Sequence, residues 1–348
     1  MFGGVKTSPC LFFLFFDPGG VCGGGCLTPA PESWSCHLPD PMLATPISTP
    51  AKGWGRIWSR RNRYYLIAFL FVLPALINFT VFRYLPILAA LRASMYQYSL
   101  LGGFGDFVGL DQYHAILSDS FFRNSLWVTL KFTIYKVPLQ VLFSLILALF
   151  LARENLGTAF VRSAVFTPVV TSVIVVSVLW SMMYHSQLGL INSLLSIVGV
   201  PPQAFLSNPD RALPALTAMM IWKDVGFSMI ILMAGLKGIP VVYREAAVVD
   251  GAKPWEVLWH ITLPLLRRVM MFVMVTQTIF SFQVFVPVYA MTRGGPLERT
   301  KAVVYYIYQY GFLFQDMGTA SAMSIVTLII LLVVSVGQMR LFRSDVSY

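Results

Sequence analysis

A lysine and an aspartate, Lys223 and Asp224, stand side by side within a long run of apolar residues. Ionisable groups are costly inside apolar segments and indicate function by default. Because neighbours in a helix project in different directions, we expect one of the two to face a cavity or another subunit. A second set combines amides and a hydroxyl with aromatic rings: Gln277, Ser281, Phe282, Gln283 and Phe285. Such groups bind polar solutes and also join helices to each other, so both sets are candidates for a solute path.

Four other side chains in apolar runs have a structural explanation beside a functional one. Lys131 and Lys136 lie in the outer part of their run, where a lysine stem can extend to the lipid headgroups, and we expect both to be structural. Trp180 and Trp222 offer faces on which a ring-shaped solute can stack, although an aromatic residue in a span more often packs against its neighbours.

No set of residues suits catalysis. The four histidines, His37, His114, His185 and His260, are far apart and have no metal-ligand partner at helical spacing. The sequence contains no GxxxxGK(S/T) pattern and no Gly-Lys dipeptide, so this chain cannot hold the phosphates of ATP in a P-loop. We predict that the chain is not an enzyme and carries no metal or cofactor of its own.

The composition is that of an integral membrane protein. Of the 348 residues, 57% are hydrophobic and 11% are charged, against about 25% charged in soluble domains. The mean hydropathy is +0.72. A net charge of +10 would indicate nucleic acid in a soluble chain, but here the distribution of lysine and arginine matters more. We predict lipid contact and no nucleic-acid partner.

The apolar runs that could cross a membrane number six, each close to the 20 residues that a helical span needs. They are Tyr65 to Leu85, Leu126 to Leu151, Val161 to Tyr184, Leu213 to Leu236, Leu265 to Met291 and Gly318 to Met339. We therefore expect residues 65–345 to form one all-α, six-span domain. Small residues along the last span predict a close-packing face, against this chain or against a partner: Gly318, Ala320, Ser321, Ala322 and Ser324.

The basic residues predict the orientation, because the cytoplasmic side of a membrane protein carries the excess of lysine and arginine. One side holds fourteen: Lys52, Arg56, Arg60, Arg61, Arg63, Arg153, Arg162, Lys237, Arg244, Lys253, Arg267, Arg268, Arg340 and Arg343. The other holds seven: Arg83, Arg92, Arg123, Arg211, Arg293, Arg299 and Lys301. Both termini are therefore expected to be cytoplasmic.

The N-terminal segment, residues 1–64, reads as a disordered basic tail rich in glycine and proline near its start. It contains all four cysteines, Cys10, Cys22, Cys26 and Cys36, at spacings that match no zinc pattern. The plainest account of residues 1–41 is a gene-model artefact, with Met42 as the true start.

A polar stretch, residues 240–264, separates the fourth and fifth spans. Pro240 suits the first turn of a short helix, and Gly251 falls where that helix would end in a left-handed residue. Lys253 and Pro254 open a second short helix, expected over residues 255–262, and Pro264 marks the entry to the next span. The sequence predicts two short helices around a glycine hinge.

The same stretch resembles the EAA loop of ATP-binding-cassette importer permeases, whose pattern is EAA-x3-G-x9-I-x-LP. The matching residues are Glu245, Ala246, Ala247, Gly251, Ile261, Leu263 and Pro264. In that family this loop is the cytoplasmic coupling helix that docks on the ATPase subunit. The resemblance implies that these residues and Asp250 couple the chain to an ATPase, with Glu245 as a polar anchor, Gly251 as the hinge and Leu263-Pro264 as the joint to the fifth span.

The resemblance extends over roughly residues 60–345 and is strongest to the carbohydrate branch, the sugar and glycerol-phosphate permeases related to the first maltose permease subunit. The segments that carry it include Phe132-Thr133, Val137 to Gln140, Gly189 to Asn192, Trp222-Lys223, Gly226-Phe227, Ser281 to Phe285, Gly294 to Pro296 and Ala320 to Ala322. Many relatives place an acidic residue after Phe285, where this chain has Val286 and Pro287. This chain therefore lacks the acidic residue that a substrate or gating role at this position would need.

The resemblance implies a type I importer permease fold in a bacterial or archaeal plasma membrane. Its partners would be a second, homologous permease, a dimeric ATPase holding ATP and magnesium, and an extracytoplasmic binding protein that delivers a sugar or polyol phosphate. ATP binding would close the ATPase dimer and turn the cavity outward through the loop, and hydrolysis would reset it.

Two other classes of protein compete with this interpretation. An ion-coupled secondary transporter needs a titratable coupling residue and usually shows internal repeats; Asp224 is the only mid-span acid, and no repeat is visible. A membrane-embedded enzyme or a scaffold is disfavoured by the missing catalytic set and by the ordered loop.

Overall fold

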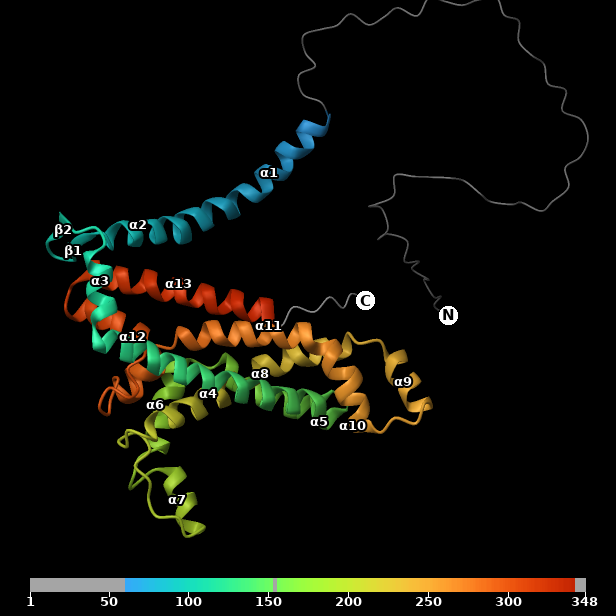
Figure 1. Cartoon of the computed structure of the whole chain (residues 1–348). Helices are drawn as coiled ribbons and strands as arrows, with labels where there is room; N and C mark the ends of the chain where they lie inside the picture. Colours follow the sequence, from blue (N-terminus) through green and yellow to red (C-terminus); the bar gives the residue numbers. More distant parts are fainter. Residues whose placement is uncertain (1–59, 153–154, 342–348) are drawn as a thin grey trace, which may run out of the picture. The chain divides into compact units, whose positions relative to one another are not determined.

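The computed structural model describes residues 60–152 and 155–341, so the predicted N-terminal tail and its cysteines lie largely outside the described residues. The chain divides into two units, Met1–Leu66 and Ile67–Tyr348, and the helical bundle belongs to the second (Figure 1). Its elements are α1 (Arg60–Phe79), α2 (Leu85–Ala93), β1 (Tyr96–Ser99), β2 (Gly103–Phe107), α3 (Asp111–Ser118), α4 (Ser120–Leu151), α5 (Leu156–Val170), α6 (Val173–Met183), α7 (Leu190–Ile197), α8 (Ala212–Lys237), α9 (Val241–Val249), α10 (Pro254–Val257), α11 (Leu263–Phe282), α12 (Val303–Tyr308) and α13 (Met317–Leu341).

The predicted membrane architecture agrees with these elements. Five continuous helices are long and apolar enough to cross a membrane: Tyr64–Ala93, Ser120–Leu151, Ala212–Lys237, Pro254–Phe282 and Met317–Leu341. A bent pair, Gly157–Val170 with Val173–Met183, makes a sixth when its two parts count as one span. The described residues are therefore mostly helical and form five spans, or the predicted six when the bent pair counts as one, and the hairpin of β1 and β2 departs from the all-α prediction.

The third predicted span, Val161 to Tyr184, is not one helix. It breaks between α5 and α6, whose axes differ in direction by 100°. Thr171 and Ser172 leave the helical conformation, with ψ angles of 148° and 128°. Pro168 lies one turn before them, inside α5, and the helix continues past it to Val170. The apolar composition of the run conceals this break.

The fifth predicted span, Leu265 to Met291, begins and ends earlier than expected. The continuous helix starts at Pro254, passes through a π-helical turn over Leu258–Thr262, and ends at Phe282. The π-helical turn lies just before Pro264, whose nitrogen has no hydrogen to donate. This turn accommodates the proline, so the helix continues where the sequence predicted a joint. The second short helix over residues 255–262 is therefore part of this long helix.

The centre of the bundle is α4, which packs along α8 and α11 while α5 packs on α8. Its buried face combines apolar residues with polar residues spaced at helical intervals, among them Thr129, Thr133, Lys136, Gln140 and Ser144. Inside a membrane bundle, polar side chains and close van der Waals packing join helices, since lipid tails are as apolar as leucine. The buried face of α4 accordingly carries the polar groups of the bundle centre.

At the end of the bundle opposite α9, the hairpin β1–β2, α3 and α12 pack against α13 (Figure 1). A Cβ added to Gly318 would lie 2.5 Å from the Tyr96 carbonyl oxygen, and one added to Gly311 would lie 3.3 Å from the Ala320 side chain. The small residues of α13 thus allow close approach to elements of this same chain. Of the two alternatives that the sequence left open, this chain or a partner, Gly318 and Ala320 pack against this chain.

Candidate functional site

Lys136 and Asp224 form an ion pair in the middle of the bundle. Lys136 Nζ on α4 lies 2.7 Å from Asp224 Oδ2 on α8. The lysine side chain is fully buried and that of Asp224 is 18% exposed. The expectation that Lys136 extends to the headgroups is therefore wrong, because a carboxylate from another helix holds its ammonium group inside the protein. The sequence named both residues but not their contact, since 88 residues separate them.

A third helix joins this pair. Lys136 Nζ also donates to Gln277 Oε1 of α11 at 3.2 Å, and Gln277 Nε2 donates to Ser228 Oγ of α8 at 3.0 Å. Gln277 and Ser228 are fully buried. We call Lys136, Asp224, Gln277 and Ser228 the buried polar cluster. It connects α4, α8 and α11 through side-chain hydrogen bonds in a low-dielectric setting, where such bonds are strong.

One turn along α4 from the buried polar cluster lies Gln140, whose side-chain amide is buried without a hydrogen-bond partner among the described residues. A further turn on, Ser144 Oγ donates to the backbone oxygen of Val225 at 3.1 Å. The polar groups of α4 thus follow the α8 contact over two turns.

Lys223 faces away from its neighbour Asp224, as the sequence predicts for adjacent residues on a helix. Its Nζ lies 3.4 Å from the backbone oxygen of Val169, near the end of α5. The side chain is nine-tenths buried. The contact of Lys223 is therefore with the backbone at the helix break, and that of Asp224 is with the centre of the bundle.

The other residues expected along a solute path lie at the end of α11 and just beyond it. Ser281 and Phe282 are buried, and Ser281 Oγ donates to the Gln277 backbone oxygen at 2.7 Å. Gln283 is exposed where α11 ends. Phe285 stacks on Tyr289 and contacts Tyr308, with ring centroids 5.6 and 5.1 Å apart. Direct contact of these residues with a solute stays a prediction.

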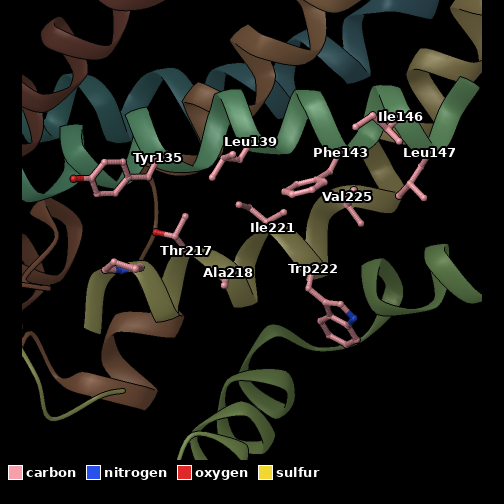
Figure 2. A pocket seen from close by; sticks show the side chains of 11 residues that line it. Tyr135, Leu139, Phe143, Ile146, Leu147, Thr217, Ala218, Ile221, Trp222 and Val225 are labelled. Carbon is pink, nitrogen blue, oxygen red and sulfur yellow. The ribbon is translucent and has the colours of Figure 1, made fainter. Parts of the chain in front are cut away.

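An open apolar groove of about 650 Å³ runs between α4 and α8. Its lining residues are Tyr135, Leu139, Phe143, Ile146, Leu147, Pro214, Thr217, Ala218, Ile221, Trp222 and Val225. Figure 2 shows Leu139 and Phe143 of α4 pointing toward Ile221 of α8 across it. The polar atoms of the lining come from Tyr135, Thr217 and the Trp222 indole. Trp222, which the sequence offered as a stacking face, belongs to this lining, but none of the other expected path residues does.

Two tryptophans lie at one edge of the groove. The rings of Trp180 on α6 and Trp222 on α8 are 5.5 Å apart, and Trp222 is 45% exposed. Both also line a second hollow of about 200 Å³ between α6 and α8. The sequence had singled out these two rings, but the groove beside them was missed, because its aliphatic lining looks like any lipid-facing surface.

The loop between the fourth and fifth spans forms the predicted helix and glycine turn. Helix α9 ends in a Schellman motif: Ala252 N–H donates to the Ala247 oxygen at 2.9 Å and Gly251 N–H to the Val248 oxygen at 3.1 Å. Gly251 has φ of +83°, and a Cβ added there would meet open space. Backbone conformation alone therefore requires the glycine.

The surface of this loop is largely apolar. Seven large side chains are exposed there: Val241, Val242, Tyr243, Val248, Val249, Trp255 and Trp259. Glu245, Ala246 and Asp250 are also exposed, while Ala247, Ile261 and Leu263 are half-buried. Lys253 N–H donates to Glu256 Oε2 at 2.8 Å and so fixes the start of the long helix. Exposed apolar side chains of this kind occur at contacts with proteins and with membranes.

The described residues contain no group of three or more His, Cys, Asp or Glu side chains that could hold a metal ion. A polar cluster connects three helices, an apolar groove runs beside it, and an exposed loop begins one of those helices.

Residues 115–347 match the family of binding-protein-dependent transport system inner membrane components. The chain belongs to this family. It is an inner membrane permease of the ATP-binding-cassette importers, as the loop motif had implied. The loop, the groove and the buried polar cluster all lie within the matched residues.

Curated relatives extend the match over most of the permease. It is 36% identical over 270 residues to the probable ABC transporter permease protein YesP of Bacillus subtilis, covering 76% of this chain and 86% of the relative. It is 33% identical to the trehalose/maltose transport system permease protein MalF of Thermococcus litoralis, covering 80% and 95%. With the sn-glycerol-3-phosphate transport system permease protein UgpA of Agrobacterium fabrum it shares 30% identity, covering 81% and 97%.

A solved structure confirms the fold. A bacterial alginate ABC transporter, in complex with an alginate pentasaccharide-bound periplasmic protein, contains a chain that superposes with a TM-score of 0.72. The match covers 84% of this permease and 100% of that chain at 24% identity. The type I importer permease fold predicted from the sequence is therefore confirmed.

Proposed function

We propose that this permease is the transmembrane subunit of an ATP-driven importer that carries a sugar or a related polyol phosphate. The observation that carries the proposal is the exposed loop of α9 and α10, which combines the family motif with an apolar surface and a hydrogen-bonded glycine turn. The substrate class is supported by the relatives, whose names specify trehalose and maltose, glycerol phosphate and arabinooligosaccharides. The permease is not itself an enzyme; ATP and magnesium would lie on its partner.

Coupling to the ATPase follows from the continuity of the long helix. The loop begins a helix that runs without interruption from Pro254 to Phe282. That helix carries Gln277, which binds Lys136 at 3.2 Å. A displacement of the docked loop would therefore move α11 as a lever and would act on α4 and α8 through the buried polar cluster. Glu245 serves as a polar anchor, and Trp255 and Trp259 supply apolar contact area.

The groove between α4 and α8 is the proposed path for the sugar. Carbohydrates present apolar C–H faces that stack on aromatic rings, and Trp222, Trp180 and Tyr135 supply such rings. The hydroxyl group of Tyr135 is available for hydrogen bonds along the lining, whereas that of Thr217 is buried and donates to the Leu213 oxygen at 2.8 Å. The buried polar cluster lies behind this surface and holds the two helices that form it. Its members, together with Lys223, would shape the path without lining it.

The orientation and partners complete the proposal. The α9 end of the bundle would face the cytoplasm, as the excess of fourteen against seven basic residues indicates. A dimeric ATPase would dock there, a second homologous permease would pack alongside in the membrane, and an extracytoplasmic binding protein would approach the opposite end, where the hairpin and α3 lie.

Reconstitution tests the function. Proteoliposomes containing the assembly purified through this permease, with its binding protein outside, should accumulate a labelled sugar or polyol phosphate only when ATP is enclosed on the ATPase side. Uptake driven by a proton or sodium gradient in the absence of ATP would contradict the proposal and would favour a secondary transporter.

A further inference from the structure

The break between α5 and α6 creates a problem of backbone hydrogen bonding inside a membrane span. The carbonyl groups of the last helical turn have no partner within their own helix. In lipid, where no water is available, other protein groups must satisfy them. Helix α5 ends at Val170, in the middle of an apolar run, so its last carbonyl groups need donors from elsewhere in the chain.

Two residues supply donors to two of these carbonyl groups. The Thr171 hydroxyl donates to the Pro168 oxygen at 2.6 Å, and the Thr171 N–H donates to the same oxygen at 3.3 Å. The next carbonyl, that of Val169, accepts from Lys223 Nζ on α8 at 3.4 Å. The carboxyl end of a helix carries a partial negative charge, so an ammonium group placed there is stabilising. Lys223 thus supplies both a donor and a complementary charge.

The close approach of α5 to α8 that this contact requires depends on Gly226. Residues three apart lie on the same face of a helix, so Gly226 and Lys223 face α5 together. A Cβ added to Gly226 would lie 2.5 Å from the Val165 oxygen and 3.0 Å from the Phe166 Cα. Real side chains do not tolerate the shorter of these distances, and an alanine would push the α5 backbone away from Lys223.

The bend also sets the position of Trp180. This tryptophan lies on α6, beyond the break, and its ring reaches to 5.5 Å from that of Trp222 on α8. If α5 continued straight into α6, the second half of the span would leave α8 and the two rings would separate. The orientation of α6 therefore decides whether the aromatic edge of the groove exists.

We propose that Lys223 is the positioning residue that holds the 100° break of the third span, with Gly226 admitting the α5 backbone to its reach. The consequence for the aromatic edge rests on the proposed function, because it assumes that the sugar passes the two tryptophans. The bend itself is a property of the permease alone and can be measured without any substrate.

The test is a distance across the break. Spin labels replace Phe160 on α5 and Leu179 on α6, both exposed, in the full chain with its four cysteines changed to serine. At 1.5 Å of rise per residue, the 100° bend places the two sites about 19 Å apart, and a straight helix about 28 Å. Double electron–electron resonance in lipid nanodiscs separates these values.

We expect Lys223→Met to shift the distance distribution toward about 28 Å, while Lys223→Arg keeps it near about 19 Å because the guanidinium retains charge and donors. Gly226→Ala should lengthen it like Lys223→Met. The matched control is Lys131→Met, which removes another intramembrane lysine, on α4, whose ammonium group lies 5.3 Å from the centroid of the Trp127 ring.

An unchanged distance in Lys223→Met would overturn the proposal, as would equal lengthening in Lys223→Arg or in the Lys131→Met control. If Lys223→Met fails to insert, Lys223→Gln replaces it in the experiment. The proposal is then contradicted if Lys223→Gln and Gly226→Ala both give the same distance as the unsubstituted chain. Because no transport is measured, failure here leaves the importer function untouched.

Discussion

Lys136 Nζ and Asp224 Oδ2, 2.7 Å apart, join the two helices that enclose the proposed sugar path. The same ammonium group reaches Gln277 on the helix that begins at the exposed loop. One lysine therefore stands at the junction between the groove and the element that would receive the ATPase. Buried ion pairs contribute little net stability compared with apolar side chains of similar volume, but removing one partner leaves a costly unpaired charge.

The ion pair leads to a prediction about stability. Asp224→Asn should destabilise the permease by about 3 kcal/mol, because Lys136 would keep a buried charge without its carboxylate. The double variant Lys136→Met with Asp224→Leu removes both charges and should recover most of that loss. Thermal unfolding in detergent measures each variant. A double variant as unstable as the single one would show that the charges themselves are required.

The glycine turn of the loop leads to a second prediction. Gly251→Val forces a β-branched residue into a φ of +83° and should abolish ATP-driven uptake while the chain still inserts. Gly337→Val is the matched control, because an added Cβ at Gly337 on α13 also meets open space but its φ is not positive. Uptake is measured in membranes, with permease abundance from immunoblots. Normal uptake by Gly251→Val would count against the hinge.

The aromatic edge of the groove can be tested through transport kinetics. Trp222→Ala should raise the KM for sugar uptake about tenfold, corresponding to roughly 1.4 kcal/mol of stacking and contact area, and Trp222→Phe should retain much of the affinity. Phe71→Ala, which truncates a highly exposed aromatic residue of α1, serves as the control. Equal kinetics for Trp222→Ala and the control would remove the groove from the path.

A pH dependence follows from Tyr306 of α12, outside the spans. Its hydroxyl donates to Asp119 Oδ2, the cap of α4, at 2.8 Å. Burial, first of all, and then hydrogen bonds to Tyr310 and Asp119 raise the pKa of Tyr306 above its usual 10.0. A raised pKa in the folded state means that stability from this group is complete below pH 10 and falls as pH rises above it.

Tyr306→Phe isolates that dependence. Near pH 7 it should lower the free energy of unfolding by about 2 kcal/mol, the contribution of a hydrogen bond to a charged group. As pH rises above about 10, the wild type should lose this advantage and approach the variant. Unfolding followed by circular dichroism between pH 7 and pH 11 measures the difference. A constant gap across that range would contradict the assignment.

Local sequence patterns determine part of this molecule. Gly251 could be placed from its position after a helix-forming stretch, because the Schellman motif depends on neighbours a few residues away. The six spans likewise follow from length and composition. The family motif then added the prediction that this loop docks on an ATPase.

Long-range contacts determine the rest. Lys131 and Lys136 look alike in sequence, and only the approach of α8 places Asp224 against the second of them. Pro168 is compatible with a kink or a full break, and the outcome depends on a donor 54 residues further along the chain, Lys223. The groove depends on which faces of α4 and α8 meet, which an almost uniformly apolar run does not encode.

The most direct test of the account is the composition of the assembly that this permease recruits. The tagged chain is purified in mild detergent and its partners are identified by mass spectrometry, alongside Glu245→Arg with Gly251→Val in the loop and Leu101→Ala, a highly exposed residue at the opposite end, as the control. We expect a P-loop ATPase and a second permease with the wild type and the control, and loss of the ATPase with the loop variant. Recovery of the permease alone, able to transport in liposomes without ATP, would contradict the account.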